Sequence, residues 1–175
     1  VLSRADMFIS VGYRPFTWQK VSLGAGNDGK LTGITHEATG QSSVYEDFTE
    51  GVVNISQLMY ACQNINTRYR LVSLNVNTPT PMRGPGEATG AFALESAMDE
   101  LSYALNIDPI ELRMRNYAEI DPSNNKPYSS KFLADAYKIG AEKIGWTERN
   151  QKPGTVMQNG WLVGYGMGAG MFGAH

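Results

Sequence analysis

A short stretch rich in proline and glycine, residues 80–88, surrounds one arginine and is the part of the sequence best suited to binding chemistry. Gly84 and Gly86, on the far side of Arg83, carry no side chain that would hold a ligand away from the backbone. A helix directly after this turn would bring free N–H groups and the positive end of its dipole to the same place. The stretch is therefore a candidate cradle for an anionic or oxygen-rich group. The alternative is an ordinary strand-to-helix turn with a solvated arginine.

The elements on both sides of this turn should fix its position. Residues 69–76 alternate polar and apolar side chains, which predicts a strand with one buried face. Prolines at positions 79 and 81 push the residues before them out of the helical region, so the approach to Arg83 should be extended. Apolar side chains then recur at helical spacing over residues 89–106. We therefore predict a strand, an extended approach, the turn and a long helix, in that order.

Two further helices should follow the long one. Asp108 suits the N-cap of the first, because a proline follows it and Glu111 occupies the reciprocal position of a capping box. Ser129 or Ser130 should cap the second helix, which should end at Gly145. The side chains expected to face inward from this second helix are Phe132, Leu133, Ala136, Ile139 and Ile144.

The first third of the chain and its last segment predict strands. Residues 7–13 mix β-branched and aromatic side chains. Residues 17–23 and 31–38 flank an Asn-Asp-Gly-Lys turn, which predicts a β-hairpin. Residues 52–60 are apolar and fit either a helix or a buried loop. A final apolar strand is expected over residues 160–173.

This order of elements favours an α+β fold, with a mixed or antiparallel sheet and helices packed on one side. The 175 residues fit one domain, which we divide into mainly strands over 1–80, mainly helices over 88–146 and a strand over 160–173. Four glycines alternate from Gly164 to Gly170. They indicate either a strand packed closely against another backbone or one that awaits a cofactor.

Composition excludes several classes of function. The net charge is −2 and the 15 basic residues are scattered, which argues against a nucleic-acid partner. No apolar run approaches the roughly 20 residues that span a bilayer. Cys62 is the only cysteine, so a disulfide framework, an iron–sulfur cluster and a thiolate zinc site are excluded within this chain. His36 and His175 have no metal-ligating neighbours at suitable spacing, so we expect no metal site.

Three stretches, residues 78–86, 91–101 and 108–116, carry a resemblance, with shorter matches from Arg4 to residues 164–167. Together they resemble the large, molybdenum-cofactor-binding subunit of the xanthine dehydrogenase and aldehyde oxidase family, and bacterial aldehyde oxidoreductases most of all. The likeness covers nearly the whole chain, and the combination is far more specific than any one motif. Because the chain begins in a strand-like pattern and ends without a polar tail, we expect an internal fragment of a longer protein.

The resemblance implies roles for the residues of the turn. Met82, Arg83 and Gly84 match the family segment that lies beside the molybdenum site and helps to bind the cofactor. Pro85 stands in the substrate-lining position where xanthine enzymes have a stacking phenylalanine. Residues 47–51 contain no arginine where those enzymes use one. Both departures disfavour purines and leave aldehydes or N-heterocycles as substrates.

The resemblance also implies that no catalytic residue lies in this chain. The glutamate general base is expected downstream, and a Gly-Gly-Phe-Gly stretch that contacts the cofactor is expected upstream. Glu87, Glu95 and Glu100 are therefore interpreted as helix-surface residues.

The parent protein is expected to carry molybdenum on molybdopterin or its cytosine dinucleotide, and to hydroxylate its substrate with oxygen derived from water. Iron–sulfur and FAD or haem groups should lie on partner domains or subunits. The chain alone is expected to be inactive, to hold no cofactor and to self-associate. Relatives of this kind occur in both cytoplasm and periplasm, so the sequence assigns no compartment. The alternatives are a catalytically silent structural or interaction module of the same fold, and a small-molecule-binding domain that uses the Arg83 turn.

Overall fold

The computed structural model describes residues 1–172, apart from the side chains of Phe8 and Ser10. Its main sheet has three strands, β1 (Thr17–Ala25), β2 (Leu31–Ser43) and β3 (Ile65–Leu74), in that order across the sheet. β1 pairs with β2 antiparallel, whereas β2 pairs with β3 in parallel. The sheet is therefore mixed, and the predicted α+β class is confirmed.

The hairpin between β1 and β2 forms where the sequence predicts it. The strands pair from Thr17 opposite Gly40 to Ala25 opposite Leu31. The turn closes through a 2.9 Å hydrogen bond from the N–H of Gly26 to the carbonyl of Lys30. Gly29 in this turn has φ +80°, a conformation that glycine adopts without strain.

The parallel pairing of β2 and β3 requires a crossover, and this connection forms part of the core. It contains the short helix α2 (Ile55–Leu58), so the apolar stretch 52–60 is one turn of helix inside a buried loop. Val52, Ile55 and Met59 are almost completely buried. The middle of the connection, residues 50–60, is therefore mostly buried, whereas residues 44–49 are mostly exposed.

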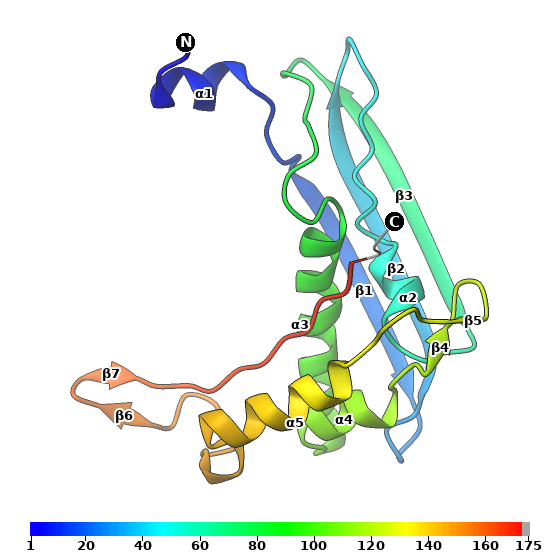
Figure 1. Ribbon diagram of the computed structural model, residues 1–175, viewed down its shortest axis with the longest axis vertical. Coiled ribbons are helices and arrows are strands. Elements are labelled where there is room, and N and C mark those ends of the chain that lie inside the picture. The colour runs from blue at the N-terminus through cyan, green and yellow to red at the C-terminus, as the bar shows by residue number, and fades with distance from the viewer. Residues whose placement is uncertain (173–175) are drawn as a thin grey trace.

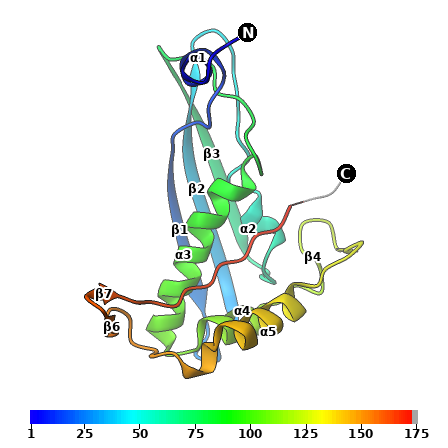
Figure 2. The same cartoon turned by 60° about the vertical axis from the view of Figure 1, so that its left-hand side comes forward.

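The helices cover one face of the sheet (Figures 1 and 2). α3 (Glu87–Leu105) runs along β1 and contacts α2 and α4 (Pro109–Arg115). The main hydrophobic core between the sheet and these helices contains Leu31, Ile34, Ile55, Met59, Tyr60, Leu94, Met98 and Leu112. On the opposite face Lys20, Glu37 and Arg68 lie side by side across the three strands and are exposed. The predicted one-sided packing of helices is confirmed.

The predicted start of α4 at Asp108 and Pro109 is confirmed, but the described contacts show no reciprocal capping box, since the Glu111 carboxylate accepts from Arg115 Nε. One carboxylate oxygen of Asp108 accepts hydrogen bonds from the backbone N–H groups of Ile110 (2.8 Å) and Glu111 (3.3 Å). Its other oxygen accepts a 2.6 Å bond from Arg149, which follows the short 3₁₀ helix η1 (Trp146–Glu148). Asp108 therefore caps α4 and ties it to the segment after α5.

The prediction of a strand over residues 7–13 is wrong, because residues 4–10 form the helix α1 (Arg4–Ser10). Ser3 accepts a hydrogen bond from the N–H of Asp6, and the Asp6 carboxylate accepts one in return from the N–H of Ser3. This capping box favours a helix more strongly than the β-branched and aromatic side chains favour a strand. α1 lies apart from the sheet and the other helices (Figure 1).

The predicted cap of α5 (Leu133–Ile144) is also wrong. The N-cap residue is Phe132, which makes no capping hydrogen bond, and neither Ser129 nor Ser130 takes that place. Gly145 ends the helix with φ +68°, as predicted. Of the side chains expected to face inward, Leu133 is half-buried, whereas Phe132, Ala136, Ile139 and Ile144 are exposed. Tyr137 is the buried residue of this helix.

The predicted last strand is mostly absent from the described residues. Only β7 (Trp161–Leu162) pairs, with β6 (Met157–Gln158), and a second small pair joins β4 (Ile120–Asp121) to β5 (Lys126–Pro127). Residues 163–172 run as an irregular segment along α3 (Figure 2). A Cβ atom added at any of the four alternating glycines would meet no atom within 4 Å, so the described contacts give no support to close packing there. His175 lies outside the described residues.

Glu95 was interpreted as a helix-surface residue, and this interpretation is wrong because its carboxylate lies at the centre of the buried helices. One oxygen accepts the hydroxyl of Tyr60. The other accepts Arg113 Nε at 2.9 Å and the backbone N–H of Ala169 at 2.8 Å. Arg113 is fully buried and also pairs with Asp99 at 2.9 Å. Burial and the Glu95 charge raise the pKa of Tyr60 well above its usual value, so this phenol remains protonated and donates.

Replacing Glu95 should show that this carboxylate supports the helices. In Glu95→Gln the guanidinium of Arg113 loses its buried counter-charge, so we expect the free energy of unfolding to fall by about 3 kcal/mol or more. Glu100→Gln, an exposed glutamate of the same helix, is the matched control and should change it by less than about 0.5 kcal/mol. Urea denaturation of both variants measures the difference, and equal effects would contradict a special role for Glu95.

His36 should make stability depend on pH. It is buried, with Nδ1 2.8 Å from Ser56 Oγ and Nε2 3.0 Å from Gln19 Oε1, and burial lowers its pKa from 6.5 to about 4. Between these values the unfolded chain binds a proton that the folded chain excludes, so stability should fall as pH drops from about 6.5 to 4. Urea midpoints at pH 7 and 5 measure this slope. His36→Gln should have a shallower slope, and an unchanged slope would exclude His36 as its cause.

Candidate functional site

The Arg83 turn lies between β3 and α3, and its approach is held by the segment before β1 (Figure 1). The N–H of Thr80 donates to the carbonyl of Tyr13 at 3.0 Å. A Cβ atom on Gly12 would lie 2.0 Å from the Thr80 side chain, so only glycine permits this approach. The extended run that the prolines predict is therefore fixed against residues 12–13.

Arg14 holds the turn from the inside. One terminal nitrogen of its guanidinium donates to Glu50 Oε1 at 2.7 Å and to Thr89 Oγ1 at 3.1 Å. The other terminal nitrogen donates to the carbonyl oxygen of Arg83 at 2.6 Å. A single planar guanidinium thus joins the crossover connection, the first turns of α3 and the peptide of Arg83.

Glu50 lies at the N-terminus of α3, and its side chain has no exposed surface. Its Oε1 atom, which binds Arg14, also accepts the N–H of Gly86 at 3.0 Å. The N–H of Ala88 has its partner within the turn, because it donates to the carbonyl of Gly84 at 3.0 Å. A carboxylate of the protein itself therefore occupies the helix end that the sequence suggested for an external anion.

The glycines of the turn have reasons in the backbone. Gly86 has φ +85°, and a Cβ there would lie 2.7–2.9 Å from the backbone of Gly51. A Cβ on Gly90 would lie 1.9 Å from the carbonyl oxygen of Val52. Gly84 has φ +60°, which also favours glycine. The crossover connection can therefore touch the start of α3 only because these positions lack side chains.

The outer side of the turn carries donors that remain available. Met82 and Arg83 are exposed, and Pro85 is half-buried. Within residues 1–172 the N–H groups of Met82, Arg83 and Gly84 have no hydrogen-bond acceptor, and the Arg83 guanidinium has no partner. Because the Arg83–Gly84 peptide is trans, the Arg83 carbonyl that points at Arg14 leaves the Gly84 N–H directed away from it. These donors fit an oxygen-rich group and do not require an anion at the helix end.

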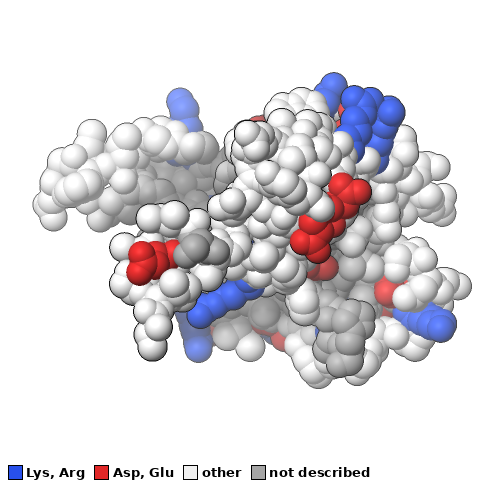
Figure 3. Space-filling view, turned by 90° about the horizontal axis from the view of Figure 1, so that it is seen from above, with Lys and Arg blue, Asp and Glu red and all other residues white. Residues whose placement is uncertain are grey.

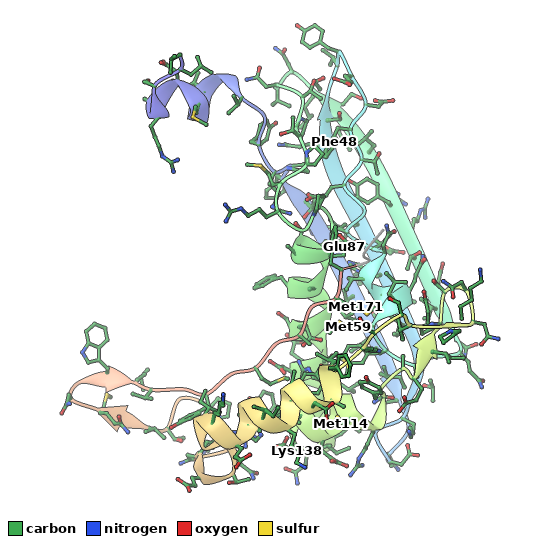
Figure 4. The ribbon with its side chains drawn as sticks, in the orientation of Figure 1. Phe48, Met59, Glu87, Met114, Lys138 and Met171 are labelled. Atoms are coloured by element: carbon green, nitrogen blue, oxygen red, sulfur yellow. The ribbon has the colours of Figure 1, made fainter. Side chains whose placement is uncertain are left out.

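Two carboxylate oxygens near the start of α3 are buried without hydrogen-bond partners in the described part of the chain, Glu50 Oε2 and Glu87 Oε2. Glu87 lies in the first turn of α3 (Figure 4). Phe48 belongs to the crossover connection and lies nearer the end of β2. Glu87 is half-buried, so its interpretation as a surface residue is only partly right. The Glu50 carboxylate pairs with Arg14. Arg83 is the one basic residue of the turn itself, residues 80–88.

Figure 3 shows small, separate groups of basic and acidic side chains on the face it displays, without a continuous basic area. No group of three or more histidine, cysteine, aspartate or glutamate side chains in residues 1–172 could hold a metal ion. Over the same residues, no helix is long and apolar enough to cross a membrane.

The sequence located the turn but missed the two side chains that hold it. The sequence did not single out Arg14, and Glu50 entered only as part of residues 47–51, which lack an arginine. The one available signal in the sequence is that Glu50 lies one glycine before the apolar residues Val52 and Val53. A carboxylate beside a buried run needs a partner, but the sequence does not say which of the 15 basic residues supplies it.

Comparison with known proteins identifies a family for the chain. Residues 1–117 match the family model of the molybdopterin cofactor-binding domain. The chain is 39% identical over 171 residues to the aldehyde oxidoreductase molybdenum-binding subunit PaoC of Escherichia coli strain K12, covering 97% of this chain and 23% of that protein. It is 26% identical over 155 residues to the putative xanthine dehydrogenase molybdenum-binding subunit XdhA of the same organism, covering 85% and 21%.

A solved structure gives the same result. The aldehyde oxidoreductase of Desulfovibrio desulfuricans superposes with a TM-score of 0.67 at 26% identity, covering 78% of this chain and 16% of that one. The chain therefore belongs to the molybdopterin cofactor-binding domain family of molybdenum oxidoreductases. It spans about a quarter of the length of the PaoC protein that it matches.

Replacing Gly86 should show that the turn depends on its backbone geometry. In Gly86→Ala both the positive φ and the contact with Gly51 become unfavourable, so we expect a loss of about 2 kcal/mol or more in unfolding free energy. Gly140→Ala is the matched control, since a Cβ there meets no atom within 4 Å in the middle of α5. It should raise stability by roughly 0.5–1 kcal/mol. Urea denaturation tests both, and a stable Gly86→Ala protein would refute the described packing.

Proposed function

We propose that the polypeptide containing this chain is a molybdenum hydroxylase that oxidises aldehydes or N-heterocycles with oxygen derived from water. Family membership and the PaoC likeness support this proposal. The observation that carries it is the outer side of the Arg83 turn, where unpaired N–H groups and an unpaired guanidinium lie together on a rigidly held backbone.

In this proposal Met82, Arg83 and Gly84 hold the molybdopterin cofactor. Their exposed N–H groups donate to its oxygen or sulfur atoms, and the inward anchor through Arg14 keeps these donors in one orientation. When bound, the molybdenum cofactor accepts two electrons from the substrate carbon as that carbon gains an oxygen atom. The chain's own contribution is to bind and orient, since the general base lies elsewhere in the parent protein.

Pro85 is proposed to line the substrate side of the turn. Proline offers a small apolar surface and cannot form the aromatic stack that would hold a purine. The crossover connection carries the exposed carboxylates of Glu46 and Asp47, and it has no arginine over residues 47–51. Uncharged aldehydes and neutral heterocycles fit this surface better than purine anions do.

Electrons would leave through iron–sulfur and FAD or haem groups on other domains or subunits. The single cysteine of the chain, Cys62, cannot supply the four thiolates that hold an iron–sulfur cluster. The chain alone should show no turnover and should self-associate. It exposes Phe132, Ile139 and Ile144 on one helix and Trp161 and Leu162 on the β6–β7 hairpin.

The experiment is the molybdenum and pterin content of the full natural polypeptide, purified from a host that makes the cofactor. Near-stoichiometric molybdenum with pterin supports the enzyme. A metal-free and pterin-free polypeptide would favour the alternative, a silent module of the same fold that serves only as an interaction domain.

The substrate class gives a separate prediction. Because Pro85 replaces an aromatic clamp, the loaded enzyme should oxidise an aromatic aldehyde with kcat/KM at least about tenfold above xanthine, which is about 1.4 kcal/mol of discrimination. Mass spectrometry of the acid formed in ¹⁸O-labelled water should find one labelled oxygen beyond carbonyl exchange. A preference for xanthine would contradict the role given to Pro85.

A further inference from the structure

The Arg83 turn is held by an ion pair between Arg14, whose side chain is 31% exposed, and Glu50. The Glu50 side chain has no exposed surface and lies beside the start of α3. Such a carboxylate is costly to bury unless a cation and hydrogen-bond donors surround it. Here the donors are Arg14 and the N–H of Gly86, both on Oε1, while Oε2 has no partner among residues 1–172.

The two bonds of the pair reach opposite ends of the turn. Glu50 binds Gly86, the residue at which α3 begins, and Arg14 binds the carbonyl of Arg83. The three residues from Arg83 to Pro85 are thus held at both ends by one connected pair of side chains. Thr89, which also accepts from Arg14, adds a contact one turn into the helix.

We propose that Arg14 and Glu50 are the positioning residues of the cofactor-binding turn, a role that rests on the proposed function of Met82, Arg83 and Gly84. Arg14 sets which way the Arg83–Gly84 peptide faces. With the carbonyl drawn inward to the guanidinium, the N–H of Gly84 faces outward. If this peptide rotated by half a turn, a carbonyl oxygen would face the cofactor in place of a donor, and two oxygens would repel.

The planar fork of arginine is essential to this role. One terminal nitrogen binds Glu50 and the other binds the Arg83 carbonyl, so charge and peptide orientation depend on separate N–H groups. A lysine at position 14 keeps the charge that Glu50 needs but places a single ammonium where two nitrogens act. Arg14→Lys therefore separates charge compensation from positioning.

The test uses the full natural polypeptide with three variants: Arg14→Lys, Glu50→Gln and the control Glu111→Gln. Glu111 pairs with Arg115 at 2.9 Å on the exposed side of α4, so its variant also removes one carboxylate of an ion pair. The first readout is tryptic cleavage of the Arg83–Gly84 bond, compared with cleavage after Lys138, which is exposed on α5 (Figure 4). A variant that unfolds globally speeds both cleavages, whereas a loosened turn speeds only the first.

In Arg14→Lys and Glu50→Gln we expect cleavage after Arg83 to rise about tenfold relative to cleavage after Lys138, the scale of one charge-assisted hydrogen bond. The second readout, molybdenum and pterin content, should fall in the same two variants and remain unchanged in Glu111→Gln. Arg14→Lys with wild-type cleavage and wild-type content would overturn the proposal and reduce Arg14 to a counter-charge. If the wild-type polypeptide holds no molybdenum, the proposed function fails, while the cleavage ratio still decides whether the pair holds the turn.

Discussion

The packing of this chain depends on one carboxylate, that of Glu95, which receives hydrogen bonds from three other segments. Tyr60 follows α2, Arg113 belongs to α4 and Ala169 belongs to the segment after β7. None of these elements has a large apolar surface of its own, since α2 has four residues and α4 has seven. The buried pair of Glu95 and Arg113 fixes these elements at one position on α3. Apolar contacts alone would let them slide along the helix.

The Arg83 turn is held by a similar arrangement at the N-terminal end of α3. A buried glutamate again receives an arginine and a backbone N–H, and it again joins segments that are distant in the sequence. α3 thus has one ionic anchor at its N-terminus and another near its middle. The first anchor holds the crossover connection and the turn, while the second holds α4 and the segment around Ala169.

Elements with strong local signals could be predicted from the sequence. The hairpin follows from its Asn-Asp-Gly turn, α3 from apolar spacing, and α4 from Asp108 and the proline after it. α1 was mistaken for a strand because its helix signal lies in two side chains, Ser3 and Asp6, and not in apolar periodicity. Residues 163–172 looked like a strand because apolar and glycine residues alternate, but they find no pairing partner within the described chain.

The candidate site divides in a similar way. Met82, Arg83, Gly84 and Pro85 were located by their residue types and by resemblance, and their roles in binding stay predictions. Arg14 and Glu50 could not be assigned, because their meaning comes from contacts across 69 and 36 positions of sequence. Glu95 was misjudged for the same reason, since a glutamate on a helix is usually solvated and only its distant partners show otherwise.

The 69-residue separation between Arg14 and Arg83 also sets an order of events during synthesis. At about 5–20 residues per second, Arg14 leaves the ribosome several seconds before the residue whose carbonyl it will hold. The β1–β2 hairpin can form in that interval. The parallel strand β3 must then join the hairpin before the turn that follows it has a sheet to pack against. The nascent chain therefore completes the Arg83 turn late, and the cofactor binding proposed for this turn would follow folding of the sheet.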